Sequence, residues 1–331
     1  MKIAIVIDTV IPVFAYGGTE RVMWYLGQAL HDMGHQVVFV APKGSSCDFA
    51  QMVHINPALP VAQQIPADVD VVHFNNERIG DDFPKPYIVT WHGNFLQGEL
   101  PLNSLFVSRN HAERHGSNQY VYNGMNWDDY ASVDLHAPRT HFHFLGQAAW
   151  RQKNVRGAID VVNRINKMSD SPTKLRIMGG HRLNLKHGIK FHWSRHADFM
   201  GMVGGQQKFD VLQRSRGFIF PVRWDEPFGI AITESLYFGS PVFATPYGSL
   251  PELVVPEVGY LCSSVQEMAE HIVRHAAYSP HACHEYARDV HNARVMAEAY
   301  LAKYEQVLNG ETLNQKPPRS LQSDSKKLQW T

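Results

Sequence analysis

Two glutamates and two cations are the side chains whose types and spacing point most directly to chemistry. Glu226 and Glu234 lie at the two ends of the segment EPFGIAITE, and Arg151 and Lys153 lie in AAWRQKN. Carboxylates accept hydrogen bonds from hydroxyl groups, and cations stabilise the charge that develops on a departing diphosphate. Taken alone, the two cations are more typical of a solvated turn, so the prediction depends on what surrounds them.

The residues between the two glutamates predict the start of a helix. Pro227 has a φ angle suited to the first helical turn, which would place Asp225 or Glu226 near the N-cap. In one interpretation Glu226 is simply a cap and Glu234 a surface residue of the helix. That interpretation leaves Gly229 unexplained, because glycine destabilises a helix.

A second interpretation gives this helix start a binding role. Its backbone amides lie at the positive end of the helix and can hold hydroxyl or phosphate oxygens. Glu226 can accept hydrogen bonds from sugar hydroxyls, and Glu234, about two turns further on, from the paired hydroxyls of a ribose. The amides concerned belong to Phe228, Gly229 and Ile230.

Two features of the N-terminal half also lie where a strand gives way to a loop. Gly17 and Gly18 precede a helix and would let a phosphate or sugar hydroxyl approach the backbone, although a tight turn explains them equally well. His92 follows the strand in TWHGN. If it titrates near neutrality, it can donate a hydrogen bond to a sugar oxygen or steady developing charge. The alternative is a structural loop histidine.

Metal sites are not expected, although the chain has 19 histidines. His192 and His196 have helical spacing, and HACH covers residues 281–284, but neither has the second half of a zinc motif. The DVD at 68–70 lies at the start of a strand, which is the wrong end for a ligand. We therefore expect no metal and no cofactor.

The elements that must position these residues alternate between strands and helices. KIAIVI predicts a strand, and the helix after it has Val22, Leu26 and Leu30 on one face, before a second strand at QVVFVAP. The pattern repeats after a linker at about 128–139. This order predicts an α/β protein with two parallel sheets. The polar, aperiodic residues 309–331 predict a flexible tail.

Composition limits the function. The chain has 331 residues, 44% of them hydrophobic and 19% charged, with a formal net charge of zero. These values favour two domains and give no reason to expect a nucleic-acid partner. Three widely spaced cysteines favour a reducing, cytoplasmic location. No apolar run reaches about 18 residues, so no transmembrane segment is expected, although peripheral membrane contact stays open.

The ordered series of motifs resembles a known family, the retaining GT-B glycosyltransferases, particularly glycosyltransferase family 4. EPFGIAITE is similar to its E-x7-E signature, YGGTERV to its first glycine loop and VTWHGN to its strand-end histidine. FLGQAAWRQKN, LRIMGG and GSPVFATPYGSLPELV resemble its later segments. The resemblance extends over about 300 residues, as far as the series of motifs runs.

The resemblance implies two Rossmann-like domains whose parallel sheets face each other across a cleft. It implies an acceptor-side domain over 1–138, a nucleotide-sugar-binding domain over 139–292 and a helix over 293–308 that packs back on the first domain. Gly18 would lie by the donor phosphates, His92 near the donor sugar and Lys153 on the diphosphate. Glu226 would bind sugar hydroxyls and Glu234 the ribose.

The implied function is transfer of a hexose-type sugar, with retention, from a nucleotide-diphosphate sugar to a hydroxyl acceptor in a glycan, lipid-linked compound or natural product. Uridine is the expected base, and polysaccharide biosynthesis the expected setting. One departure is Gln147, where the family has an arginine. That change keeps a catalytically weak or non-catalytic nucleotide-sugar binder as an alternative, beside an epimerase of the same fold.

Overall fold

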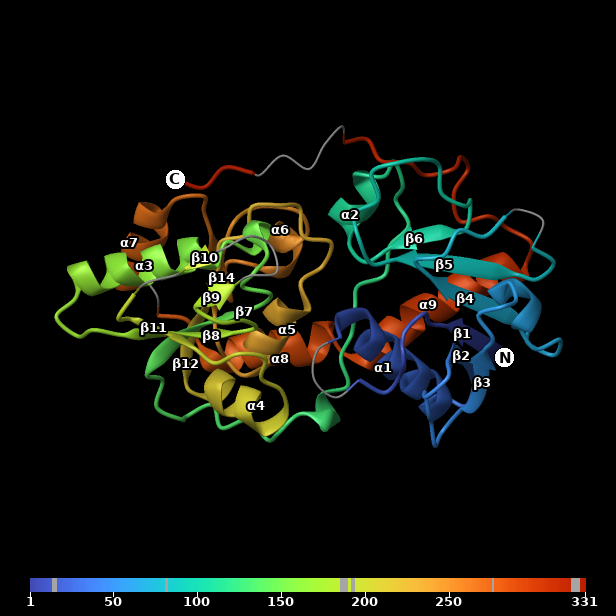
Figure 1. Ribbon diagram of the computed structural model, residues 1–331, viewed down its shortest axis with the longest axis horizontal. Coiled ribbons are helices and arrows are strands. Elements are labelled where there is room, and N and C mark those ends of the chain that lie inside the picture. The colour runs from blue at the N-terminus through green and yellow to red at the C-terminus, as the bar shows by residue number, and fades with distance from the viewer. Residues whose placement is uncertain (14–16, 81–82, 185–189, 192–193, 276, 323–327) are drawn as a thin grey trace. The chain divides into compact units, whose positions relative to one another are not determined.

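The computed structural model describes residues 1–13, 17–80, 83–184, 190–191, 194–275, 277–322 and 328–331. The chain divides into two compact units. Unit 1 comprises Met1–Trp127 and Val290–Asp324, and unit 2 comprises Asp128–Asp289 and Ser325–Thr331. The first boundary therefore lies earlier than residue 138, and the chain passes between the units three times. Each unit has its own sheet, and each is described by itself (Figure 1).

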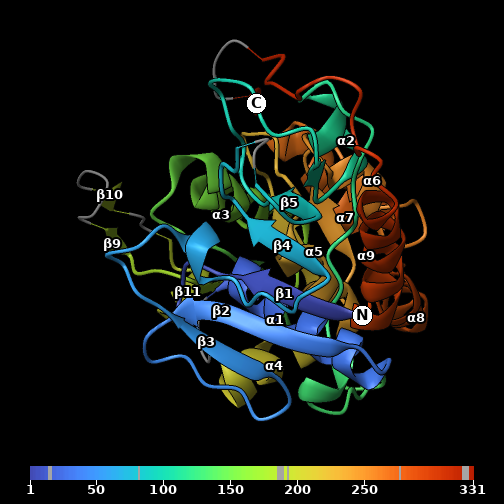
Figure 2. The same ribbon diagram turned by 90° about the vertical axis from the view of Figure 1, so that its right-hand side faces the viewer.

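Unit 1 contains a six-stranded parallel sheet in the order β3-β2-β1-β4-β5-β6. Figure 2 shows β3, β2, β1, β4 and β5 side by side in this order, with the twist usual for parallel sheets. The central strands are buried on both faces, as their continuous apolar runs predict. The strands are β1 (Lys2–Val6), β2 (Gln36–Pro42), β3 (Gln51–Ile55), β4 (Val71–Asn75), β5 (Tyr87–Trp91) and β6 (Ser104–Phe106).

Helices of unit 1 cover this sheet. In α1, Val22, Leu26 and Leu30 are fully buried, which confirms the predicted apolar face. Helix α9 packs against α1 and β5. Its buried Tyr300 and Tyr304 hydroxyls are bonded to side chains of the sheet. The helical segments are α1 (Gly18–Asp32), η1 (Val61–Gln64), α2 (Arg109–Glu113), η2 (Trp127–Asp129, which crosses the unit boundary) and α9 (Ala293–Leu308).

Unit 2 contains the second parallel sheet, in the order β11-β8-β7-β12-β13-β14, so the prediction of two parallel sheets is confirmed. A short antiparallel pair, β9 and β10, stands apart from it. The strands are β7 (His141–Leu145), β8 (Lys174–Met178), β9 (Leu183–Asn184), β10 (Lys190–Phe191), β11 (Ala197–Phe199), β12 (Ser215–Phe220), β13 (Val242–Ala244) and β14 (Gly259–Leu261).

Helix α3 crosses the middle of the second sheet, where it contacts β7, β8 and β12, and α5 contacts β12 and β13. None of the helices in the described part of the chain is long and apolar enough to span a membrane. The helical segments of unit 2 are η3 (Arg151–Lys153), α3 (Val155–Met168), α4 (Gly205–Gln213), α5 (Ile230–Tyr237), α6 (Leu250–Leu253), α7 (Val265–His275) and α8 (Pro280–Val290).

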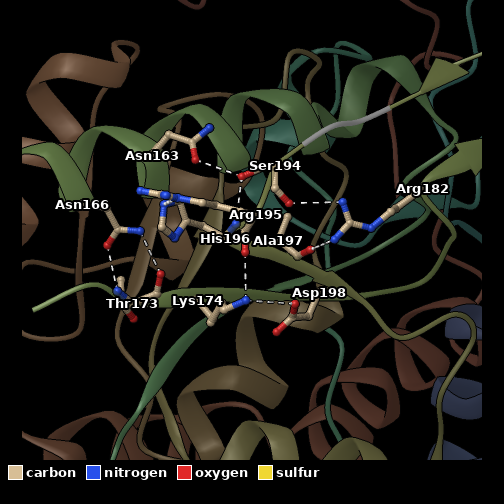
Figure 3. Close-up of polar contacts among 10 residues, drawn as sticks. All are labelled: Asn163, Asn166, Thr173, Lys174, Arg182, Ser194, Arg195, His196, Ala197 and Asp198. Carbon is tan, nitrogen blue, oxygen red and sulfur yellow. Dashed lines mark hydrogen bonds and ion pairs between the residues drawn. The ribbon is translucent and has the colours of Figure 1, made fainter.

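Backbone carbonyls hold the edge strand β11 in place (Figure 3). Arg182 donates to the carbonyls of Ser194 and Ala197 at 3.1 and 2.5 Å, and Lys174 donates to the carbonyl of Arg195 at 2.8 Å. Asn163 on α3 lies 3.0 Å from the Ser194 hydroxyl. Long cationic side chains thus bond the Ala197 carbonyl of the edge strand and the carbonyls of Ser194 and Arg195 in the turn before it.

The prediction of a flexible tail over 309–331 is wrong for the described residues. Leu313 is buried, and the Asn314 amide donates to the carbonyls of Leu102 and Ser104 at 2.8 and 2.7 Å. The Leu100 amide donates to the Pro318 carbonyl at 2.8 Å. A polar, aperiodic composition cannot reveal this, because the partners are backbone groups far away in the sequence.

Candidate functional site

The helix that carries Glu234 begins later than the sequence predicts. Helix α5 starts at Ile230, and its N-cap is Gly229 with φ 98°. The expectation that Asp225 or Glu226 caps this helix is therefore wrong. The Asp225 carboxylate instead accepts from the Gly248 amide at 3.1 Å. Glycine is used at position 229 because the chain needs a left-handed residue there to turn from the loop into the helix.

Phe228, Gly229 and Ile230 form the junction between this loop and α5. Phe228 is buried, and its carbonyl accepts a hydrogen bond from the Ser249 hydroxyl at 2.6 Å. Gly229 and Ile230 are the N-cap and first residue of α5, so their amides belong to the helix's N-terminal set, which has no partner within the helix. The junction is thus fixed by its carbonyls and presents a helix start, as the second interpretation of the sequence requires.

Glu226 is held rigidly through its backbone. Its carbonyl accepts from the Ser249 amide at 2.9 Å. Gly248, with φ 62°, lies so close that a Cβ there would be 2.3 Å from the Glu226 nitrogen. The indole nitrogen of Trp224 donates to the Glu226 carboxylate at 2.9 Å. The direction of this side chain is therefore set by the loop and by its neighbouring tryptophan.

Lys153 and Glu226 form an ion pair at 2.6 Å, with only 12% and 9% of their side chains exposed. The two residues follow β7 and β12, which are neighbours in the parallel sheet. Carboxyl ends of neighbouring parallel strands meet at one edge of a sheet, which is where such folds bind ligands. The ammonium group also lies 4.9 Å from the centre of the Trp224 ring. The structure thus brings together two of the predicted residues.

The loop after β7 that carries Lys153 has further anchors. Asn154, at φ 54°, is the N-cap of α3, and its amide donates to the Pro221 carbonyl at 2.8 Å. Gln147 lies on the same loop, and its carbonyl accepts from the Trp150 amide. Arg151 is exposed in η3, so this loop carries a second cation close in sequence to Lys153. Lys153 is the less exposed of the two.

Glu234 is buried, which excludes the alternative that it is a surface residue. Lys208 of α4 forms an ion pair with it at 2.6 Å, and the Tyr130 hydroxyl donates to the same carboxylate oxygen at 2.6 Å. The sequence analysis missed both partners, since nothing in the sequence links α4 or the residues after Trp127 to this helix. Trp224 was also missed, although it lies two residues before Glu226.

His92 does not titrate near neutrality, which corrects the expectation from sequence. Burial lowers its pKa to about 3, so the ring is neutral. The Asn75 amide nitrogen donates to the Val6 carbonyl at 2.9 Å, and its oxygen therefore faces His92 Nε2, also at 2.9 Å. That nitrogen must be the donor, which leaves Nδ1 as the acceptor of the neutral ring.

Gly17 and Gly18 lie at the start of α1, in unit 1 together with His92. Gly17 is the N-cap, and a Cβ there would lie 2.8 Å from Val13 Cγ1. An added Cβ would therefore have to displace the Val13 side chain, so packing favours glycine at position 17 whether or not a ligand approaches it. Tyr16 of the same motif lies outside the described residues.

No group of three or more histidine, cysteine, aspartate or glutamate residues that could hold a metal ion occurs within the described ranges. His192, one of the histidines considered from sequence, lies outside those ranges, while His196 lies inside them, with its ring 3.0 Å from the Arg195 side chain.

Comparisons with known proteins concern the fold and residues 139–277. The family model described as Glycosyl transferases group 1 matches residues 139–277. No curated protein is significantly similar in sequence. AviGT4, a glycosyltransferase involved in avilamycin A biosynthesis, superposes with a TM-score of 0.76 at 20% identity, covering 94% of this chain and 99% of AviGT4.

Two further solved structures show the same architecture. Sucrose-phosphate synthase from Thermosynechococcus elongatus gives a TM-score of 0.65 at 16% identity, covering 94% of this chain and 100% of that one. Anabaena Alr3699/HepE, solved in complex with UDP and glucose, gives 0.62 at 12% identity, covering 92% and 100%. The fold is therefore GT-B, with two Rossmann-like domains, and residues 139–277 of this fold are the part that matches the group 1 glycosyltransferase model.

Proposed function

We propose that this protein is a retaining glycosyltransferase of family 4 that transfers a hexose-type sugar from a UDP-sugar to a hydroxyl acceptor. The observation that carries the proposal is the buried pair of Lys153 and Glu226, at the ends of two neighbouring strands of a group 1 glycosyltransferase domain. An ammonium group beside a carboxylate matches a donor that presents a diphosphate next to sugar hydroxyls. We place the reaction in the cytoplasm, without a metal or cofactor.

In the proposed reaction Lys153 exchanges its bond to Glu226 for one to the donor diphosphate. The bond between the anomeric carbon and the diphosphate oxygen breaks, and Lys153 and the amides at the start of α5 stabilise the charge that develops on the leaving group. Glu226, held by Trp224, accepts hydrogen bonds from the sugar hydroxyls. The acceptor hydroxyl forms its new bond from the same face and gives its proton to the departing phosphate oxygen.

His92 and Glu234 have narrower roles in this proposal. His92 presents an unprotonated Nδ1, which can accept a hydrogen bond from a hydroxyl of the donor sugar. Glu234 accepts hydrogen bonds from the ribose hydroxyls while Lys208 neutralises its charge. Gly17 and Gly18 provide close backbone approach to the donor, and Arg151 supports Lys153 at the diphosphate.

Calorimetric titration with UDP and then GDP, without added metal, is the first test. Saturable binding of one of them identifies the base, and we then expect its sugars to be transferred to hydroxyl acceptors with retained anomeric configuration, as read by NMR. Lys153→Met and Glu226→Gln should each abolish transfer. The proposal fails if neither nucleotide binds, or if the product is inverted.

A non-catalytic nucleotide-sugar binder is the second candidate, and Gln147 is the observation that favours it. With an uncharged amide at that position, Lys153 is the buried cation of this loop, and it has less positive charge beside it with which to stabilise a leaving group. Release of UDP from a bound UDP-sugar distinguishes the two candidates. A binder releases no UDP from a bound UDP-sugar when hydroxyl acceptors are supplied, whereas the enzyme does.

A further inference from the structure

Residues 328–331, here called segment 328–331, are bonded to unit 2 beside the candidate site. The Leu328 amide donates to the Arg223 carbonyl at 3.1 Å, and Arg223 Nε returns a bond to the Leu328 carbonyl at 2.8 Å. The Tyr247 hydroxyl donates to the Gln329 carbonyl at 2.8 Å. Figure 1 shows this end of the chain near α3 and α7.

The last residue of the segment is bonded to the loop before α7. The Thr331 amide donates to the Ser263 carbonyl at 3.0 Å, and the Val265 amide donates to the Thr331 carbonyl at 2.7 Å. Val265 is the first residue of α7, so this carbonyl satisfies one of the amides that a helix leaves unpaired at its start. Segment 328–331 therefore has a defined backbone register on unit 2.

The Trp330 side chain accounts for the glycine at position 157, which helix propensity alone would disfavour. Gly157 lies in the first turn of α3, where glycine costs stability. A Cβ at this position would lie 2.6 Å from Trp330 Nε1 and 2.4 Å from the Asn154 amide nitrogen. The indole thus occupies the space beside Gly157, next to the residue that caps α3 and follows Lys153.

Arg223 connects the segment to the ion pair. Its amide donates to the Gln152 carbonyl at 2.7 Å, in the turn that carries Lys153. On its other side, its carbonyl and Nε are bonded to Leu328. Arg223 also directly precedes Trp224, which donates to Glu226. The contacts therefore run from segment 328–331 through Arg223 to both members of the Lys153–Glu226 pair.

Burial of apolar surface does not account for the position of segment 328–331 on the rest of unit 2. Gln329 and Thr331 are exposed, and Leu328 and Trp330 are only partly buried, so little apolar surface is gained. The bonds are instead made to the loops that follow β12, β13 and β14, through backbone groups of Arg223, Ser263 and Val265 and through the side chains of Arg223 and Tyr247. Such bonds fix the position of a loop, and the loop after β12 carries Glu226, a proposed ligand of the donor.

We propose that segment 328–331 is a positioning element for the diphosphate site, acting through Arg223 and Gln152 on Lys153 and through Trp224 on Glu226. The inference rests on the proposed function for the identity of the ligand, while the residues that segment 328–331 itself contacts lie outside those assigned to the site. It predicts that the segment affects recognition of the second phosphate of the nucleotide and has little effect on the nucleoside.

The test compares nucleotide affinities in wild type, Trp330→Ala and Tyr247→Phe. The probes are the diphosphate that the wild type binds, UDP or GDP, and its monophosphate, titrated by calorimetry. We expect Trp330→Ala to weaken diphosphate binding about tenfold, which corresponds to about 1.4 kcal/mol, and to leave monophosphate binding unchanged. Tyr247→Phe should show the same selectivity with a smaller change. Tyr278→Phe, which removes a bond to His271 in the same unit, is the matched control and should change neither affinity.

Three outcomes would overturn the proposal. Equal weakening of both nucleotides would indicate a general structural role. No change in either would show that the segment is dispensable, and tighter diphosphate binding would show that it obstructs the site. A purely structural role would also lower the melting temperature without separating the two nucleotides.

Hydrogen exchange distinguishes failure of this inference from failure of the proposed function. If the wild type binds neither nucleotide, the proposed function fails, but amide exchange can still be measured. Trp330→Ala should then speed exchange in 151–154 and 221–226, because Leu328 no longer fixes the loop that holds the Arg223 amide against the Gln152 carbonyl. Exchange in β4 and β5 of unit 1 should stay unchanged. Unchanged exchange in both segments would overturn the positioning role as well.

Discussion

The buried polar groups of the two units differ in kind. In unit 2 they form two charged pairs, Lys153 with Glu226 in loops that follow neighbouring strands and Lys208 with Glu234 between helices α4 and α5, each at 2.6 Å. In unit 1 they form a neutral network, in which His92 is bonded to Asn75, and His73 to Thr90 and Tyr304. Buried charges must be paired, whereas neutral groups need only satisfied hydrogen bonds. In the function we propose, unit 2 exchanges one charged partner for another, and unit 1 presents fixed donors and acceptors.

The largest expected effect on stability comes from a substitution that breaks a buried charged pair. Lys208→Met leaves Glu234 buried without its cation, and we expect the free energy of unfolding to fall by about 3–5 kcal/mol. Adding Glu234→Gln should restore part of the loss. Chemical denaturation measures both. Arg294→Met, which removes an exposed pair with Glu298, is the control and should cost under about 1 kcal/mol. Equal losses for Lys208→Met and Arg294→Met would show that burial of the pair is unimportant.

A second change acts on the backbone beneath Glu226. Gly248→Ala places a Cβ 2.3 Å from the Glu226 nitrogen, and backbone atoms cannot yield as a flexible side chain can. We expect a loss of about 3 kcal/mol in unfolding free energy, together with loss of nucleotide binding. At Gly205, also at positive φ, an added Cβ meets nothing within 4 Å, so Gly205→Ala should cost only about 1 kcal/mol. Similar effects at both positions would attribute the loss to φ alone.

The neutral network of unit 1 predicts that the unfolding free energy depends on pH. Burial lowers the pKa of His73 to about 3, below the usual value of 6.5. The unfolded state therefore binds a proton that the folded state refuses, so the contribution of His73 is present above pH 6.5 and is lost as the pH falls toward 3. Between pH 7 and 5 we expect this histidine alone to lower the unfolding free energy by about 2 kcal/mol.

Denaturation of wild type and His73→Gln at pH 7 and 5 measures that difference. The variant should lose less stability on acidification than the wild type. His54→Gln removes an exposed histidine of β3 and should leave the pH dependence of the wild type unchanged. If His73→Gln behaves as His54→Gln does, then His73 is protonated in the folded state and the network is not neutral.

The smallest effect concerns the second partner of Glu234. Tyr130→Phe removes one hydrogen bond to a buried carboxylate and should lower the unfolding free energy by about 1.5 kcal/mol. Tyr260→Phe removes a similar bond to the exposed Glu267 and is expected to cost less. If the two losses match, Lys208 alone accounts for the burial of Glu234. Thermal unfolding of the purified variants is a sufficient measurement.

The parts of the fold that could be predicted from sequence are those that follow from the period of apolar residues and from the order of the motifs. The apolar face of Val22, Leu26 and Leu30 and the alternation of strands and helices follow from local patterns, and the structure confirms them. The order of the motifs predicted the GT-B fold. The start of α5 was predicted wrongly because Pro227 also suits a loop, and the left-handed φ of Gly229, which marks the true N-cap, has no separate signal in the sequence.

The sequence by itself determined which residue types are present and in what order: two carboxylates around a glycine, a lysine after one strand and a histidine after another. Only the tertiary structure decided their partners, because Lys208 reaches Glu234 and Asn75 reaches His92 from other segments of the chain. In the same way Trp330 reaches Gly157 from a distant segment. The tertiary structure also decided that His92 is neutral, since burial is a property of the packed molecule and shifts a pKa that the residue type leaves near neutrality.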